Sequence, residues 1–311
     1  MKNQYRIRNW SKYNAGLKLR GSLTFWLDEK VVEQWIVKNK TGKRGASQTY
    51  SDIAIGMFST FKSIYSLAGR QAEGFIKSVF TLMNIDLPVP EHSTVSRRLA
   101  SLTISLPVEK SSNPRHLVVD STGIKVYGEG EWKTRQHGIG KRRTWRKLHL
   151  GVDESTGEIV SAVVTTNNYH DSQVLEDILA GVKGEIEQVS ADGAYDTQNC
   201  YEQIEQRQAR AVIPPRKNAK IQQHGNCKSP PLPRDENLRR IRKLGRKKWK
   251  QECGYHRRSL AETTMFRLKC IFGGKVTSRK FENQSTELFL QCVALNLMNQ
   301  ICRSESYAVV L

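Results

Sequence analysis

The segment HLVVDSTGIKVY, residues 116–127, marks the point where the pattern of the chain changes. It is apolar and rich in β-branched residues, which predicts a buried strand. Asp120 interrupts this apolar run. A buried carboxylate without a partner is costly, so Asp120 requires either a cation or a dense set of hydrogen bonds.

The segments after this strand follow a definite order. Residues 145–166, WRKLHLGVDESTGEIVSAVVTT, predict two strands joined at the DESTGE turn. A helix is predicted over 170–182, then a short strand ending at Asp192, a helix beginning near Asp196, and a last short strand at RAVIPP (210–215). Three strands, a helix, a strand, a helix, a strand and a later helix are the order of a ribonuclease H-like fold, an α/β mixed sheet with flanking helices.

The other acids of this region have simpler interpretations. Asp153 and Glu154 fall in the hairpin turn and need no function. Asp171, or Ser172 beside it, and Asp196 are interpreted as helix caps. Asp192 stands at the end of a strand before Gly193, so a turn residue is the alternative to a functional carboxylate.

A single acid, Glu262, lies within the basic segment of residues 255–280, which holds seven Lys or Arg residues. At about 100° per residue, Tyr255, Arg258 and Lys269 fall within roughly 40° of Glu262 on a helix. Ala261, Met265, Leu268 and Phe272 form a separate apolar stripe that packs on the sheet. The pattern favours a functional row beside a core stripe, and the alternative is an ordinary surface helix.

Asp120, Asp192 and Glu262 thus come from three separate elements. Three carboxylates fit phosphodiester chemistry, in which two Mg²⁺ ions about 4 Å apart activate a nucleophile and stabilise the leaving oxygen. Hard oxygen ligands favour Mg²⁺ or Mn²⁺ over zinc. The surrounding Arg and Lys residues would offset phosphate charge.

The charge of the whole chain points to a polyanionic partner. The 311 residues carry a formal net charge of +20 with 38% hydrophobic residues, which is typical of a globular protein that binds nucleic acid rather than of a disordered chain. No apolar run of membrane-spanning length or secretory signal is visible, and the six cysteines show no zinc-like spacing. We therefore expect a cytoplasmic, nucleoid-associated bacterial protein with no membrane partner.

Residues 1–112 are predicted to be mainly helical, with a net charge of +9. Ser51 and Asp52 can begin one helix, and Ser93 can cap a short helix after the break NIDLPVP. On that short helix Arg97 and Arg98 are left facing outward, as in a helix-turn-helix reader of DNA. A plain helical bundle is the alternative.

Residues 214–252 are a basic insertion, with 13 Lys or Arg against 3 Asp or Glu. Its proline-rich start and dense basic end predict a loop that runs into a basic helix, with a solvated linker as the alternative. The predicted division is a helical DNA-binding domain at 1–112 and a catalytic domain at 113–311 that contains this insertion.

Several motifs resemble bacterial insertion-sequence DDE transposases. These are D-S-T-G at 120–123, A-D-G-A-Y-D at 191–196, and the Y-(2)-R-(3)-E-(6)-K spacing of Tyr255, Arg258, Glu262 and Lys269. The similarity is greatest to the group that includes insertion sequence five. It extends to RGSLTFWLDE, HSTVSRR and VYGEGEW with KRRTWRKLHLGVD, and so covers most of the chain.

The resemblance implies a transposase that binds the terminal inverted repeats of its element, hydrolyses the DNA at the 3′ ends and joins the freed 3′-hydroxyl to target DNA. Asp120, Asp192 and Glu262 would bind two Mg²⁺ ions, with Mn²⁺ able to substitute. Arg258 and Lys269 would hold phosphates and Tyr255 would contact the DNA, while paired ends would require a homo-oligomer.

Candidates for flanking-DNA contacts are Arg142, Arg143 and Arg146, together with Trp132 and Trp145, for which core packing is the alternative. Two other functions stay open. A structure-specific endonuclease of the same fold would share the acids without an end-binding domain, and a non-catalytic DNA-binding regulator would tolerate the loss of any acid.

Overall fold

The computed structural model describes residues 4–38, 47–126, 145–216, 218–223 and 230–309. Its internal contacts divide the chain into two compact units. We call Val108–Thr277 the sheet unit, and Met1–Pro107 together with Ser278–Leu311 the helical unit. The sequence predicted a division near residue 112, with everything after it in one domain. In the structure the residues from Ser278 onward group with the N-terminal helices instead.

The sheet unit is built on a mixed six-stranded sheet in the order β4-β3-β2-β5-β6, with β7 paired to the end of β2. β2, β3 and β4 are antiparallel neighbours, whereas β5, β6 and β7 join by parallel pairing. The strands are β2 Arg115–Val126, β3 Trp145–Asp153, β4 Ile159–Thr166, β5 Ile186–Ser190, β6 Arg210–Val212 and β7 Lys275–Val276. This architecture is compatible with the predicted ribonuclease H-like fold.

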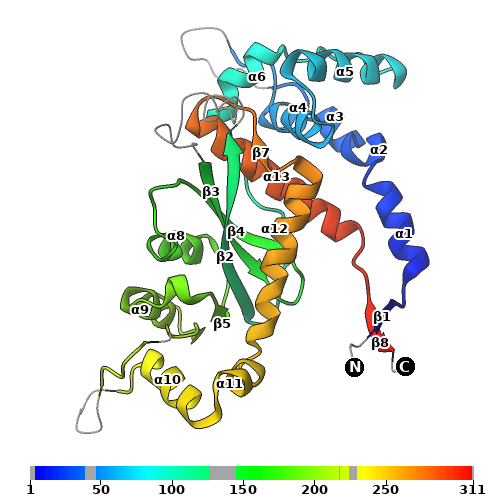
Figure 1. The fold of residues 1–311 in the computed structure, drawn as a ribbon. Helices are drawn as coiled ribbons and strands as arrows, with labels where there is room; N and C mark the ends of the chain where they lie inside the picture. The colour runs from blue at the N-terminus through cyan, green and yellow to red at the C-terminus, as the bar shows by residue number, and fades with distance from the viewer. Residues whose placement is uncertain (1–3, 39–46, 127–144, 217, 224–229, 310–311) are drawn as a thin grey trace, which may run out of the picture. The chain divides into compact units, whose positions relative to one another are not determined.

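Alternation along β2 separates its two faces. Leu117 and Val119 point into an apolar cluster with side chains of α8 (Leu175–Gly181) and α9 (Gln198–Gln206). The intervening residues, Val118 and Asp120, therefore face the other side. There α12 (Ser259–Phe272) contacts β2 and β3 (Figure 1). The sheet is covered on both faces, as predicted.

The predicted order of elements is confirmed, but two predicted helix caps are wrong. α8 begins at Leu175, after the short 3-10 turn η2 (Asp171–Gln173), and Asp171 accepts a hydrogen bond from Lys147 Nζ at 3.1 Å instead of capping it. α9 begins after Thr197, whose hydroxyl accepts from the Cys200 amide. Because Thr197 caps α9, Asp196 is available for another partner.

The basic insertion contains two helices, α10 (Pro233–Leu244) and α11 (Arg246–Glu252). Trp249 of α11 is 2% exposed and packs with Val212 of β6 and Cys253. The described part of the insertion is thus folded against the sheet unit, which argues against a loose solvated linker.

The helical unit is organised around its long last helix, α13 (Phe281–Ile301), which contacts α4 and η1. Polar side chains of α13 bond to main-chain carbonyls of the N-terminal segment: Asn283 to Ser96 at 2.9 Å and Asn296 to Pro107 at 3.1 Å. These bonds explain why the C-terminal residues join this unit. Its other elements are β1 Gln4–Ile7, α1 Trp10–Leu19, α2 Leu23–Trp26, α3 Glu29–Glu33, α4 Asp52–Ile64, α5 Gly69–Leu82, α6 His92–Arg98, η1 Leu99–Ser101 and β8 Ser306–Val309.

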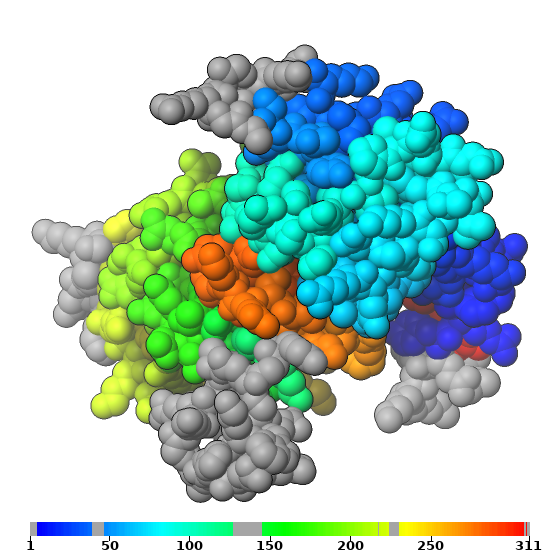
Figure 2. Space-filling model, turned by 90° about the horizontal axis from the view of Figure 1, so that it is seen from above, coloured from blue at the N-terminus to red at the C-terminus, as the bar shows by residue number. Residues whose placement is uncertain are grey.

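Helices α4, α5 and α6 form one continuous surface, coloured blue to cyan in Figure 2. Ser51 caps α4 as predicted, because its hydroxyl accepts from the Ala54 amide at 3.1 Å. The prediction that Ser93 caps α6 is wrong: Glu91 is the N-cap residue, and Ser93 donates to its carboxylate at 3.3 Å. Residues 83–91 separate α5 from α6, which is longer than the tight turn of a helix-turn-helix.

Candidate active site

Asp120 lies in the interior of β2, on the face of the sheet that α12 covers. Its side chain is 16% exposed. One carboxylate oxygen accepts from the Ser121 amide at 2.8 Å, and the other accepts from Arg258 Nη1 at 2.7 Å. Burial raises the pKa of Asp120, and the negative charges of Asp192 and Glu262 add to this effect although Ser121 and Arg258 oppose it.

Asp192 reaches the same region from β5. Parallel pairing sets Val118 of β2 opposite Ser190 of β5, so continuing this register by two residues brings Asp192 level with Asp120. Asp192 also serves its own turn, because its Oδ1 accepts from the Ala194 amide at 2.9 Å and caps the 3-10 turn η3 (Gly193–Tyr195). The turn interpretation and the proximity to Asp120 are therefore compatible.

Glu262 lies in the first turn of α12, with its side chain 56% exposed. The predicted core stripe of this helix is confirmed, since Ala261, Met265, Leu268 and Phe272 are all buried. Glu262 stands on the flank of that stripe, which is why it stays open to solvent while α12 packs on the sheet.

Arg258 joins the two acids. Its Nη1 donates to Asp120, and its Nη2 donates to Glu262 Oε1 at 2.5 Å. Burial opposes the charge of Arg258, but Tyr255, Asp120, Glu262 and Asp192 outweigh burial and raise its pKa. A lysine carries a single ammonium and cannot span two carboxylates in this way.

The helix predicted through Tyr255 begins later than expected. Tyr255–Arg258 form a 3-10 turn, η4, which starts at Gly254 with a φ of 66°, and the α-helix begins at Ser259. A left-handed φ favours glycine, so Gly254 allows the sharp change of direction after α11. The 100° spacing therefore holds from Glu262 to Lys269 but not back to Tyr255.

Tyr255 is half-buried beside the acids. Burial raises its pKa; the Arg258 charge opposes this, whereas the charges of Asp192 and Asp120 add to it. Arg258 Cζ lies 5.9 Å from the centre of its ring, and Lys250 Nζ lies 4.9 Å from it. Lys269 lies about two helical turns beyond Glu262 on the same flank of α12 and is half-exposed.

A divalent cation fits the chemistry of these donors. Asp120, Asp192 and Glu262 supply hard carboxylate oxygens, and their mutual effect on the pKa of Asp120 marks a concentration of negative charge. Among the described residues no group of three His, Cys, Asp or Glu side chains is arranged to hold a metal ion. Arg258 stands between Asp120 and Glu262 and balances their charge.

Some predicted DNA-contact residues lie elsewhere. Arg142, Arg143 and Trp132 fall outside the described residues. Arg146 and Trp145 lie at the start of β3, both half-exposed, with Lys125 Nζ 5.9 Å from the Trp145 ring centre. These two residues flank the strand that pairs with β2 but do not join the acids.

Arg97 and Arg98 lie in the helical unit and differ from each other. Arg97 is exposed and bonds only locally, to Thr94 Oγ1 at 3.2 Å. Arg98 is 13% exposed, ion-paired with Asp52, and donates to the carbonyl of Tyr50. The prediction that Arg98 faces outward is therefore wrong, because its guanidinium ties α6 to the start of α4.

Sequence reasoning also missed three features. Asp153 is 2% exposed and ion-paired with Arg115, and Asp196 is buried against Arg234 at 2.9 Å, so neither is a plain turn or cap residue. Phe266, one turn beyond Glu262, is 67% exposed, whereas an aromatic residue on a helix suggests core packing. Thr197, a good cap beside Asp196, was the one sequence signal for any of these.

Two family models, both described as Transposase DDE domain, match residues 18–129 and 111–297. The second match spans well over half of the chain and includes Asp120, Asp192 and Glu262. The chain belongs to the DDE transposase family. Members of this family are in general metal-dependent DNA-cleaving enzymes that act on DNA and use divalent metal ions. Within the described residues, no helix of this transposase is long and apolar enough to cross a membrane.

Proposed function

We propose that this transposase binds the terminal inverted repeats of an insertion sequence, cleaves the DNA at their 3′ ends, and joins each freed 3′-hydroxyl to target DNA. The observation that carries the proposal is the convergence of Asp120 from β2, Asp192 after β5 and Glu262 from α12, with Arg258 bonded to two of them.

Asp120, Asp192 and Glu262 would hold the divalent ions, which we propose to be two Mg²⁺, with Mn²⁺ as a substitute. Such ions activate a water or hydroxyl and stabilise the leaving oxygen of a phosphodiester. Carboxylates at the ends of a sheet and on the flank of a helix leave one side open to DNA. The exposure of Glu262, at 56%, supports this assignment.

Arg258 has two roles in this proposal. In the protein alone it offsets the charge of Asp120 and Glu262, which it contacts at 2.7 and 2.5 Å. When cations take over that charge, its planar guanidinium is released to bind a phosphate beside the cleaved bond, a geometry that arginine suits. Lys269 would hold a second phosphate as a point charge, and Tyr255 would pack against the DNA.

The helical unit would recognise the terminal repeats, and paired ends would require two or more protomers. The exposure of Arg97 supports a DNA contact on α6, and Arg142, Arg143 and Arg146 remain proposed contacts to flanking DNA. Arg98 is withdrawn from this set, because its bonds to Asp52 and Tyr50 give it a structural role.

The test is cleavage of a labelled duplex that carries the inverted repeat flanking the gene, with Mg²⁺ or Mn²⁺. Wild type should nick the 3′ end of the repeat and, with target DNA present, form a strand-transfer product. Glu262→Gln should bind the duplex and leave it uncut.

Other results would change the conclusion. Nicking without a strand-transfer product would favour a structure-specific endonuclease. Binding of the repeat without cleavage by wild type under either metal would favour a regulator. Equal cleavage by Glu262→Gln would remove Glu262 from the site.

A further inference from the structure

The turn between α10 and α11 concentrates positive charge. Gly245, with a φ of 81°, links the two helices, and four exposed cations flank it within residues 242–248. We call this set the basic corner: Arg242, Lys243, Lys247 and Lys248. In the part of the chain that the structure describes, none of the four forms an ion pair. No acid occurs anywhere in residues 237–251.

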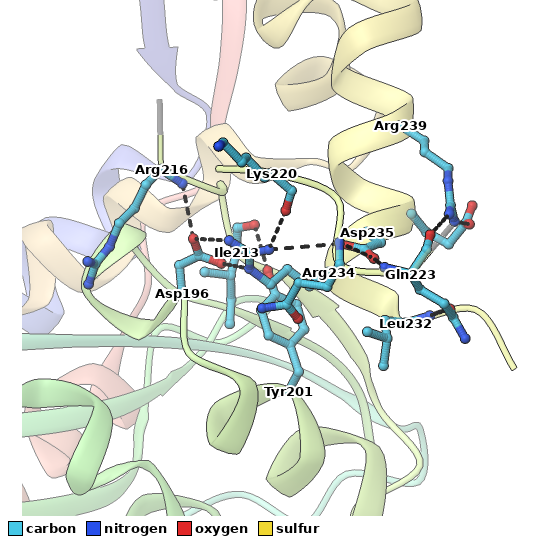
Figure 3. Close-up of polar contacts among 12 residues, drawn as sticks. Asp196, Tyr201, Ile213, Arg216, Lys220, Gln223, Leu232, Arg234, Asp235 and Arg239 are labelled. Carbon is cyan, nitrogen blue, oxygen red and sulfur yellow. Dashed lines mark hydrogen bonds and ion pairs between the residues drawn. The ribbon is translucent and has the colours of Figure 1, made fainter. Parts of the chain in front are cut away.

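The first arm of the corner, α10, is held to the sheet unit by a buried polar network (Figure 3). Arg234 Nε donates to Asp196 Oδ1 at 2.9 Å, and its Nη1 donates to the Lys220 carbonyl at 3.2 Å. Asp235, 0% exposed, accepts from the amides of Gln222 and Gln223 at 3.0 and 2.7 Å. Asp196 follows Asp192 by four residues, so α10 is bonded to the same loop that carries a candidate metal ligand.

The second arm, α11, is held beside Tyr255. The Trp249 ring lies 6.1 Å from the Tyr255 ring, and Lys250 Nζ lies 4.9 Å from the centre of that ring. Arg246 donates to the Pro215 carbonyl at 2.7 Å, and an ion pair between Arg240 and Glu252 at 2.9 Å joins the two helices. Both arms are therefore fixed relative to the candidate active site.

Four neighbouring cations repel one another, and a rigid support that keeps them together is explained by a polyanion that binds across them. α11 has seven residues, or about 10 Å of helix, which corresponds to about three base pairs of B-DNA. A duplex with its backbone at Arg258 and Lys269 would have to extend by this order of distance to reach the corner.

We propose that the basic corner binds the phosphodiester backbone of duplex DNA a few base pairs from the cleaved phosphate, in a register set by the contacts of Arg234 and Trp249. This inference rests on the proposed function for the position of the cleaved phosphate. The binding itself is sequence-independent, because no base-reading side chain is involved.

The experiment compares two charge-matched double variants, Lys247→Gln/Lys248→Gln in the corner and Lys110→Gln/Lys183→Gln on exposed sites elsewhere in the sheet unit. Dissociation constants for a random-sequence duplex are measured across about 50–200 mM salt. Each lost phosphate contact lowers the log–log slope by about 0.9, so the corner variant should lose up to ~1.8 and the control should keep the wild-type slope. Arg242→Gln/Lys243→Gln should behave like the corner variant.

Further measurements separate folding, charge and position. Lys247→Arg/Lys248→Arg should restore the slope, and the circular dichroism melt of each variant should match wild type. On the repeat duplex, the corner variants should nick with a raised KM and an unchanged kcat, and trimming the duplex close to the cleavage site should abolish their difference from wild type.

Equal slopes for the corner and control variants would overturn the inference, even if wild type cleaves. A defect that persists on the trimmed duplex would also overturn it. If wild type never cuts the repeat duplex but the corner slopes differ, DNA binding by the corner stands and the proposed reaction fails.

Discussion

Arg258 Nη1 lies 2.7 Å from Asp120 Oδ2, although 138 residues separate them in the sequence. The pair joins the middle of β2 to the turn before α12. Arg258 also contacts Glu262 one turn further along, so a single guanidinium balances two carboxylates of the candidate site. The first prediction follows from this geometry.

Arg258→Lys should lower DNA cleavage by about two orders of magnitude while keeping the charge, because an ammonium cannot donate in parallel to Asp120 and Glu262 or to a phosphate. Single-turnover cleavage of the repeat duplex measures the effect. Lys269→Arg serves as the comparison, since a point contact to a phosphate tolerates that exchange. Wild-type rates for Arg258→Lys would contradict a bidentate role.

Asp196→Ala should destabilise the protein by about 3–5 kcal/mol, because it leaves Arg234 partly buried without its partner carboxylate. The Asp196 side chain is 0% exposed and that of Arg234 is 15% exposed. Urea unfolding gives the change. The control is Arg240→Gln, which removes the exposed ion pair with Glu252 and should cost at most about 1 kcal/mol. Similar losses for both variants would show that the Asp196 pair is not special.

His149 should make the stability of the protein depend on pH. Its side chain is fully buried, and burial lowers its pKa to about 4, with Asp171 opposing the shift and Lys147 adding to it. Because the unfolded chain binds the proton more tightly, stability is present above the unfolded pKa near 6.5 and is lost as pH falls toward 4. At about 1.4 kcal/mol per pKa unit the loss is of the order of 3 kcal/mol.

His149→Gln is the matching variant, since an amide keeps a polar partner for Thr165 Oγ1, which lies 2.9 Å from Nε2. The free energy of unfolding between pH 8 and pH 4 should fall less steeply for this variant than for wild type. His116, whose pKa burial also lowers, accounts for part of the remaining slope. Identical pH profiles would exclude His149 as a source.

Arg97 and Arg98 are neighbours with opposite expected effects. Arg98→Ala should cost about 1–3 kcal/mol of stability, because its hydrogen bonds to Asp52 and the Tyr50 carbonyl are lost. Arg97→Ala should leave stability within about 0.5 kcal/mol and weaken binding of the repeat duplex. Thermal melts and anisotropy titrations of the two variants measure both quantities. Weaker DNA binding by Arg98→Ala at unchanged stability would reverse the assignment.

Local patterns were enough to predict much of the fold. The apolar run of β2, the DESTGE turn and the stripe of Ala261, Met265, Leu268 and Phe272 each depend on neighbours within a few residues, and each is confirmed. Sequence reasoning also selected Asp120 correctly as a partly buried acid that needs a partner, because an acid inside an apolar strand has few explanations.

Errors occurred where two local interpretations were equally good. Asp196 resembles a helix cap in sequence, but Thr197 takes that position and frees Asp196 for Arg234. Arg98 resembles an outward DNA contact, but Asp52, 46 residues earlier, takes its guanidinium. In both residues the choice depends on a partner that is distant in the chain.

The sequence by itself determined the elements, the acids that can serve the chemistry and the excess of positive charge. Hydrophobic periodicity, capping and charge are properties of short segments, so they can be read without the fold. Only the tertiary structure decided that Arg258 pairs with Asp120 and Glu262, that Arg234 holds α10 against Asp196, and that α13 joins the N-terminal helices. These are contacts between segments far apart in sequence, and they form only when packing brings the segments together.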